Sequence, residues 1–226
     1  AIPYEVGEGT HPDNPKGPNP YADSGQMAAE RTFFVHQGLG PSGQDSHCCL
    51  LKNWGEKCPV CIEKASLERN GEDKEVTEAL KPKERQLRLI YDRGDKDKGV
   101  QLLEAAYWGG GKVQGFGQII DNKIEALDDD DPRCRYEDPE DGMTLEVKIK
   151  SGNWRGRTTY NPTNLEIVPR KSPPAIDFDS VPCLDDLPIH LTFDELKEVL
   201  ENTGGGEEAS SNGEDRKHGK KKKSTK

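Results

Sequence analysis

The chain has 226 residues, of which 31% are hydrophobic and 33% are charged, and 40 are glycine or proline. This composition allows one domain of ordinary size with long tails and excludes a chain in which every segment is buried in a core. The net charge of -10 does not exclude a nucleic-acid partner, because residues 31–172 carry 25 acids and 23 bases and the excess acid lies elsewhere.

The first thirty residues predict a flexible arm. They carry five acids and one base, four prolines lie between positions 12 and 20, and no apolar period is present. Order is expected to begin at Phe33, because residues 33–170 contain ten of the 14 aromatic residues, including all three tryptophans. The folded domain is therefore assigned to residues 31–172.

Two cysteines near the start of this domain have the spacing of a metal site. Cys58 and Cys61 are separated by two residues, one of them Pro59, so a tight turn can direct both thiolates at one ion. A tetrahedral site needs two further ligands, and the upstream candidates are His36, His47, Cys48 and Cys49. Because adjacent residues point in different directions, only one or two members of the cluster at 47–49 can reach the ion.

We favour a closed set of three thiolates and one imidazole, which suits one structural zinc ion and leaves no position for a catalytic water. The favoured set is His36, Cys49, Cys58 and Cys61. Cys48 as an alternative to Cys49, and His47 as an alternative to His36, stay open. A redox pair of the thioredoxin type is a competing interpretation, although no βαβ pattern surrounds the two cysteines.

The rest of the domain is expected to be rich in antiparallel sheet. Alternation of apolar and polar residues predicts strands at 86–92, 143–150, 154–160 and 165–168, with a turn at 151–153. Helical spacing predicts helices at 62–67 and within 113–127. A mainly β domain with a few helices is compatible with an OB-fold barrel of five strands.

This domain contains cationic and aromatic side chains of the kinds that bind a nucleic-acid strand. Single-strand binding needs cations along the phosphates and aromatic faces on which bases stack. Lys148 and Lys150 share the face turned away from the apolar residues of their strand, and glycines follow the aromatic pair at 107–108. The candidate DNA-binding residues are Arg88, Tyr107, Trp108, Lys112, Lys148, Lys150, Trp154, Arg155, Arg157 and Tyr160.

The C-terminal part divides into an acidic tail at 173–209, with ten acids and one base, and a basic, disordered end at 210–226. Thr192 and Glu195 form a capping-box pattern that predicts a helix over 192–202. Its apolar residues are expected either to dock in a partner's groove or to pack on the chain's own domain.

With these residues described, the chain resembles the phage single-stranded DNA-binding proteins similar to the zinc-containing helix-destabilising protein of T-even phages. The resemblance covers roughly residues 33–170. Its carriers are the spacing His-x12-Cys-x8-Cys-x2-Cys from His36, the segment QLRLIYDRGDKDKGVQLLE at 86–104 and the segment DPEDGMTLEVKIK at 138–150.

The resemblance implies an OB fold with a zinc-ribbon insertion at 36–61 and a basic, aromatic cleft for single-stranded DNA. It implies a protein that is not an enzyme, that protects single strands and removes their secondary structure during phage replication, recombination and repair, and that acts in the host cytoplasm. In such proteins the acidic tail recruits replication and recombination partners, such as a polymerase, helicase or primase.

Two features depart from that pattern. A lysine-rich stretch follows the acidic tail, and the first residues lack the strongly basic start that supports self-association on DNA. The competing functions are a zinc-ribbon transcription or protein-interaction factor and, with less support, a metal-dependent nuclease that uses the acids at 128–131 or 138–141. No apolar run reaches the roughly 18 to 20 residues that cross a bilayer, and no signal-peptide pattern is present, so an intracellular, soluble protein is expected.

Overall fold

A computed structural model gives the fold. It describes residues 1–17, 19–109, 114–154 and 157–204, with the backbone alone at 154, 157 and 179. This part of the chain is mainly β and contains five α-helices. Short 3-10 turns occupy Lys96–Lys98, Pro132–Arg135, Phe178–Ser180 and Leu184–Asp186. Among the described residues, no helix has the length and apolar character needed to cross a membrane.

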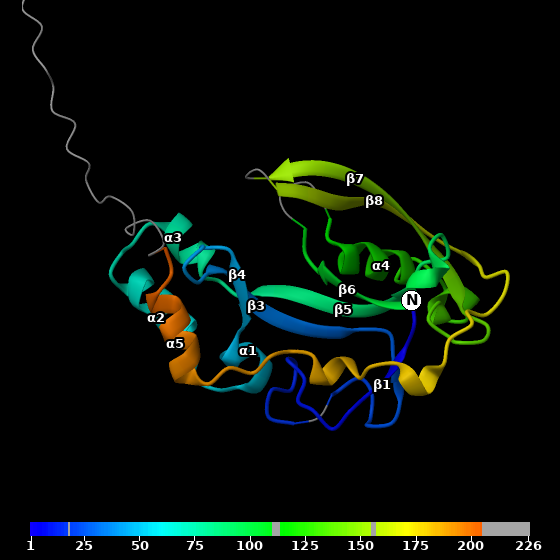
Figure 1. Cartoon of the computed structure of the whole chain (residues 1–226), viewed down its shortest axis with the longest axis horizontal. Coiled ribbons are helices and arrows are strands. Elements are labelled where there is room, and N and C mark those ends of the chain that lie inside the picture. Colours follow the sequence, from blue (N-terminus) through cyan, green and yellow to red (C-terminus); the bar gives the residue numbers. More distant parts are fainter. Residues whose placement is uncertain (18, 110–113, 155–156, 205–226) are drawn as a thin grey trace, which may run out of the picture.

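The central sheet has four antiparallel strands in the order β4-β3-β5-β6 and curls into half a barrel, which is compatible with an OB-like fold (Figure 1). Their bounds are β3 Arg31–Leu39, β4 Asp45–Cys48, β5 Lys83–Tyr91 and β6 Val100–Ala106. The strand predicted at 86–92 is thus confirmed and begins three residues earlier. Both faces of β5 are covered, because four successive residues from Gln86 to Leu89 are buried.

A long hairpin is the second sheet. It consists of β7 (Met143–Trp154) and β8 (Arg157–Pro169), with a register shift after Lys148. The turn predicted at 151–153 is wrong, because Ser151, Gly152 and Asn153 continue β7 and pair with β8. The segments predicted at 154–160 and 165–168 mostly belong to one strand, β8. Helix α4 (Phe116–Ile124) contacts both β6 and β8, and it confirms the helix expected within 113–127 (Figure 1).

Three helices lie between β4 and β5 in the sequence: α1 (Leu50–Trp54), α2 (Pro59–Arg69) and α3 (Lys74–Ala79). Helix α2 starts with a proline in its first turn, where no intrahelical N–H is needed. It confirms the helix expected at 62–67 and extends it at both ends. Helix α1 ends at Gly55, whose φ of 68° is the left-handed conformation that favours glycine.

The first thirty residues do not form a separate arm, which corrects the sequence-based expectation. Ile2, Tyr4 and Val6 are buried against Phe33 and Leu89, and Ile2 is bridged to Leu89 in β5. Strand β1 (Tyr4–Glu5) pairs with β2 (Met27–Ala28). The alternating apolar residues at 2, 4 and 6 are the physical reason, because they offer one apolar face that covers β5.

The C-terminal segment 173–204 also packs on the domain. It runs past the N-terminal segment to α2, where helix α5 (Phe193–Glu201) lies (Figure 1, yellow to orange). The capping box of Thr192 and Glu195 is present, as predicted. Leu184 and Leu196 are fully buried, and Asp185 forms a buried ion pair of 2.8 Å with Arg31 in β3. The helix was expected either to dock in a partner or to pack on the chain's own domain, and in the structure it packs on its own domain. The basic end predicted at 210–226 lies outside the described residues.

A metal-ligand cluster and a candidate nucleic-acid cleft

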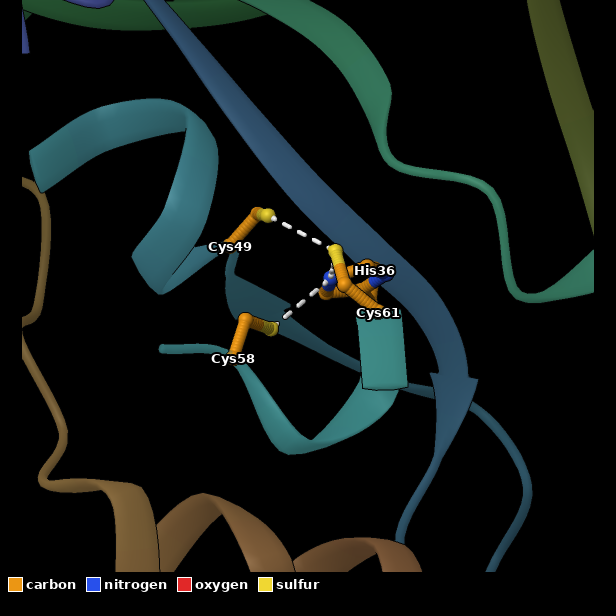
Figure 2. Close-up of side chains that lie close together, drawn as sticks. All are labelled: His36, Cys49, Cys58 and Cys61. Carbon is orange, nitrogen blue, oxygen red and sulfur yellow. Dashed lines mark hydrogen bonds between the residues drawn. The ribbon is translucent and has the colours of Figure 1, made fainter. Parts of the chain in front are cut away.

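The metal-ligand candidates come from the sheet and from two helix N-termini. His36 lies on β3, Cys49 is the N-cap of α1, Cys58 is the N-cap of α2, and Cys61 lies in the first turn of α2 (Figure 2). A side chain at an N-cap points back over the start of its helix, so the two helices direct three sulfur atoms at the imidazole on the strand. These four residues form a cluster that could hold a metal ion of the zinc type.

The distances between the ligand atoms are those of a compact site. His36 Nε2 lies 3.4 Å from Cys58 Sγ and 3.6 Å from Cys61 Sγ, and the Sγ atoms of Cys49 and Cys61 are 3.6 Å apart. All four ligand atoms lie within 4.8 Å of one another. A tetrahedral zinc ion with Zn–S of about 2.3 Å and Zn–N of about 2.0 Å separates its ligand atoms by roughly 3.5 to 3.8 Å. The residues present therefore fit such an ion.

A further hydrogen bond fixes the orientation of the imidazole. His36 Nδ1 lies 2.8 Å from the carbonyl oxygen of Leu80, at the end of α3, so Nδ1–H donates and Nε2 is left to face the three sulfur atoms. Lys52 N donates to Cys49 Sγ over 3.4 Å. The imidazole and the Cys49 and Cys58 side chains are buried, which protects the cluster from competing water.

The pKa values of the side chains in the cluster are shifted in different directions. Burial lowers the pKa of His36, but hydrogen bonds to Cys58 and Cys61 outweigh this effect and raise the pKa to about 9. Hydrogen bonds from Cys49 and Cys61 lower the pKa of Cys58, whereas hydrogen bonding with Cys58 raises the pKa of Cys49 to about 11. The Cys58 thiolate is thus stabilised by hydrogen bonds from its neighbours, and a cation in the centre would take over that role.

The alternatives that the sequence left open point elsewhere. His47 pairs with His36 across β3 and β4, but its side chain is outside the cluster. Cys48 packs against the core formed with the N-terminal segment, and burial raises its pKa to about 11. The structure therefore brings together the four favoured residues, because Cys49 turns inward where Cys48 turns toward the other core.

A cleft of about 1190 Å³ separates the central sheet from the hairpin. One wall comes from β5, β6 and the segment after each strand, and the other comes from β7 and β8. Apolar side chains make up much of its lining; they include Leu103, Phe116, Leu145, Val147 and Ile149. The residues of β7 that alternate with Lys148 and Lys150 thus face the cleft.

Aromatic and cationic side chains border this apolar surface. Trp108 is 56% exposed and Tyr160 is 72% exposed, and both line the cleft. Three half-buried arginines lie along it: Arg85, Arg93 and Arg170. Arg85 is paired with Glu104 at 2.9 Å, whereas Arg93 and Arg170 donate hydrogen bonds to backbone carbonyl oxygens. The cleft therefore offers stacking surfaces together with cations.

Arg88 is a correction to the expected DNA-binding set. Its side chain is 1% exposed and forms an ion pair with Glu30, while Nη1 donates to Tyr136 Oη over 2.8 Å. The alternation along β5 is as predicted, but the face that carries Arg88 is covered by the layer that contains Tyr136 and α4. A phosphate cannot reach this guanidinium.

The other expected DNA contacts are divided between two surfaces. Trp108 and Tyr160 line the cleft, and Tyr107 lies behind Trp108 with its hydroxyl bonded to Asp121 in α4. Lys148 and Lys150 are exposed on the opposite face of the hairpin. Lys112 and Arg155 lie outside the described residues. Trp154 and Arg157 are paired at the end of the hairpin, where only the backbone is described.

The arginines of the cleft were not among the DNA-binding residues predicted from the sequence. Arg93 and Arg170 each follow the last residue of a strand by one or two positions, β5 and β8 respectively. A basic residue just after a predicted strand was the available signal, but only the pairing of strands shows that these positions open on one cleft. The sequence matches no protein-family model, and it matches no curated protein.

Proposed function

We propose that this protein binds single-stranded DNA without strong sequence preference, in the cleft between the central sheet and the hairpin. The observation that carries the proposal is the combination of two exposed aromatic rings and three arginines around one apolar cleft. Together with the family resemblance, it favours a binding protein that protects single strands in phage DNA replication, recombination and repair.

The chemistry of the cleft suits unpaired bases. Aromatic faces accept stacked bases of any identity, at about 1 to 3 kcal/mol per base, and the arginines can follow the phosphates. An apolar lining favours bases that have left their duplex, because paired bases expose only their edges in the grooves. Trp108 and Tyr160 lie on opposite walls, one after β6 and the other in β8.

The order of the strands supports an OB-like fold as part of the proposal. The five long strands are β3, β5, β6, β7 and β8, which is the strand number of an OB barrel. In that fold the second and third strands and the loops 1-2 and 4-5 contact oligonucleotides. Here the second and third strands are β5 and β6, which line the cleft, and three members of the metal-ligand cluster lie in the segment between β3 and β5 that corresponds to loop 1-2.

We assign a structural role to the metal. Three cysteines and one histidine supply all four positions of a tetrahedral zinc ion, so the ion would join β3 to the starts of α1 and α2. Its contribution to DNA binding would be indirect, since it would hold the insertion at the end of the cleft strands. Catalysis is not part of the proposed function.

Replication and recombination proteins would meet the acidic surface of α5 and not its apolar stripe. Leu196 is buried against the metal-ligand region, whereas Asp194, Glu195 and Glu198 are exposed. A partner with a basic surface could use these acids without unfolding the segment.

A fluorescence titration tests the proposed function. Oligo-dT and a duplex of equal length are added at two salt concentrations while tryptophan emission is followed. Quenching by the single strand alone, weakened at the higher salt, is expected from stacking and phosphate binding together. Equal binding of the duplex would favour a transcription factor of the zinc-ribbon type, and the absence of binding to either would overturn the proposal.

A further inference from the structure

The indole of Trp108 is held by a carboxylate at the edge of the cleft. Its Nε1–H donates to Glu84 Oε2 over 2.7 Å, although more than half of the side chain is exposed to solvent. Glu84 belongs to β5 and its backbone carbonyl oxygen also accepts from Tyr107 N over 3.3 Å. The same glutamate therefore restrains both the backbone before the indole and the indole itself.

Tyr107 supports the indole from the other side. The two rings meet edge to face, with centroids 4.9 Å apart and planes at 82°. The hydroxyl of Tyr107 donates to Asp121 Oδ2 over 2.7 Å, and this bond, followed by burial, raises the pKa of Tyr107. Asp121 lies in α4, so the aromatic pair is tied to a helix as well as to the sheet.

The backbone around the pair is also closely packed. Gln118 N donates to the carbonyl oxygen of Tyr107 over 3.3 Å. A side chain at Gly115 would overlap with that carbonyl group, and one at Gly117 would overlap with the ring of Tyr107. These two positions require glycine so that the start of α4 can approach the aromatic pair.

Glu84 and Asp121 lie beside the proposed DNA-binding cleft, where their negative charge would oppose the binding of phosphates. Their presence there indicates another role. A ring that is fixed before binding loses less conformational entropy when a base stacks on it. We propose that Glu84 and Asp121 are positioning residues, which hold Trp108 and Tyr107 so that the indole face is ready to receive a base. This inference rests on the proposed function and adds the residues that orient its stacking surface.

Two substitutions at one position separate positioning from charge. Glu84→Gln and Glu84→Ala remove the same negative charge, but only the glutamine keeps an acceptor for the indole N–H. Glu84→Gln is expected to bind oligo-dT at least as tightly as the unaltered protein. Glu84→Ala is expected to bind about fivefold more weakly than Glu84→Gln, which corresponds to one hydrogen bond.

Glu146 supplies the matched control. It is exposed on β7, on the same face of the hairpin as Lys148, and away from the lining of the cleft. Glu146→Gln and Glu146→Ala should bind oligo-dT equally. Tyr107→Phe is a second variant of the positioning pair, since it keeps the ring and removes only the bond to Asp121, and about twofold weaker binding is expected.

The indole N–H resonance of Trp108 in a ¹H–¹⁵N spectrum, identified with Trp108→Phe, gives a readout in the free protein. It should shift less in Glu84→Gln, which keeps a neutral acceptor, than in Glu84→Ala, which keeps none. If the unaltered protein binds oligo-dT but the two Glu84 variants bind equally, positioning is overturned while the proposed function stands. If the unaltered protein does not bind oligo-dT, the proposed function fails, and an unmoved resonance in Glu84→Ala would overturn the positioning as well.

Discussion

The metal-ligand cluster and the cleft are built in opposite ways. The cluster draws four potential ligands from 26 consecutive residues and buries three of them, His36, Cys49 and Cys58. The cleft draws its lining from residues spread between Ala1 and Pro174 and leaves two aromatic rings exposed. The proposed metal site is therefore local and closed, whereas the proposed DNA-binding site is assembled from distant strands and stays open.

Substitution of a proposed metal ligand should have the largest effect, which is a loss of stability. Cys58→Ala is expected to lower zinc affinity by more than about 100-fold and to lower the unfolding temperature, because binding free energy of a structural zinc is folding free energy. Zinc content after dialysis and a thermal melt measure both quantities. Cys48→Ser, next to the cluster but outside it, should retain one zinc per chain; zinc loss in that variant and not in Cys58→Ala would contradict the ligand set.

Removal of a buried side chain from α5, the helix that packs on the cluster region, should lower the stability somewhat less. Leu196→Ala is expected to lower the free energy of unfolding by about 2 to 5 kcal/mol, because a fully buried leucine leaves a cavity. Chemical denaturation gives the value. Leu51→Ala is a matched control, since this leucine in α1 is 47% exposed. A stability unchanged by Leu196→Ala would show that α5 does not pack there in solution.

Removal of an aromatic ring from the cleft should affect binding and spare stability. Tyr160→Ala is expected to weaken oligo-dT binding by about 1 to 3 kcal/mol through the loss of one stacked base. Tyr21→Ala is the control, because Tyr21 is 75% exposed but lies outside the cleft lining. Binding constants from titration and melting temperatures are compared. Equal loss of affinity in both variants would place the strand outside the cleft.

Removal of a single positive charge from the cleft should have the smallest effect on the affinity for DNA. Arg93→Gln is expected to weaken binding by about threefold to tenfold at moderate salt and to reduce the salt slope by about one, as for one phosphate contact. Lys150→Gln removes the same charge from the outer face of the hairpin, and its slope should change less. Titrations across several salt concentrations give the slopes, and a larger change for Lys150 would move the path of the DNA to the outer face.

The same contrast explains which features the sequence could predict. The cluster was predictable because cysteine and histidine are chemically specific and their spacing is short. The position of Cys49 rather than Cys48 needed the geometry of the α1 N-cap. Strand β5 was predictable from alternation, but the burial of Arg88 was not, because alternation shows two faces and does not show that both are covered.

The N-terminal segment shows the limit of composition as a guide. Its prolines and glycines indicated an arm, yet three apolar residues at alternate positions are enough to place it in the core. Two arginines of the cleft, Arg93 and Arg170, were missed for a related reason: each lies just beyond a strand, and only the packing of the hairpin over the sheet brings them together. The capping box of α5 was predicted because its signal lies within four residues.

The ion pair between Arg31 and Asp185 has a consequence for synthesis of the chain. Arg31 and Asp185 are 154 positions apart, and Asp185 also accepts a hydrogen bond from Gly7 N, 178 positions before it. At about 5 to 20 residues per second, roughly 8 to 30 seconds separate the emergence of Arg31 and of Asp185 from the ribosome. During that time Arg31 lacks its buried partner, and the core around Tyr4 is incomplete. The last step of folding therefore waits for the C-terminal segment, and a nascent chain stopped before residue 185 should stay sensitive to protease.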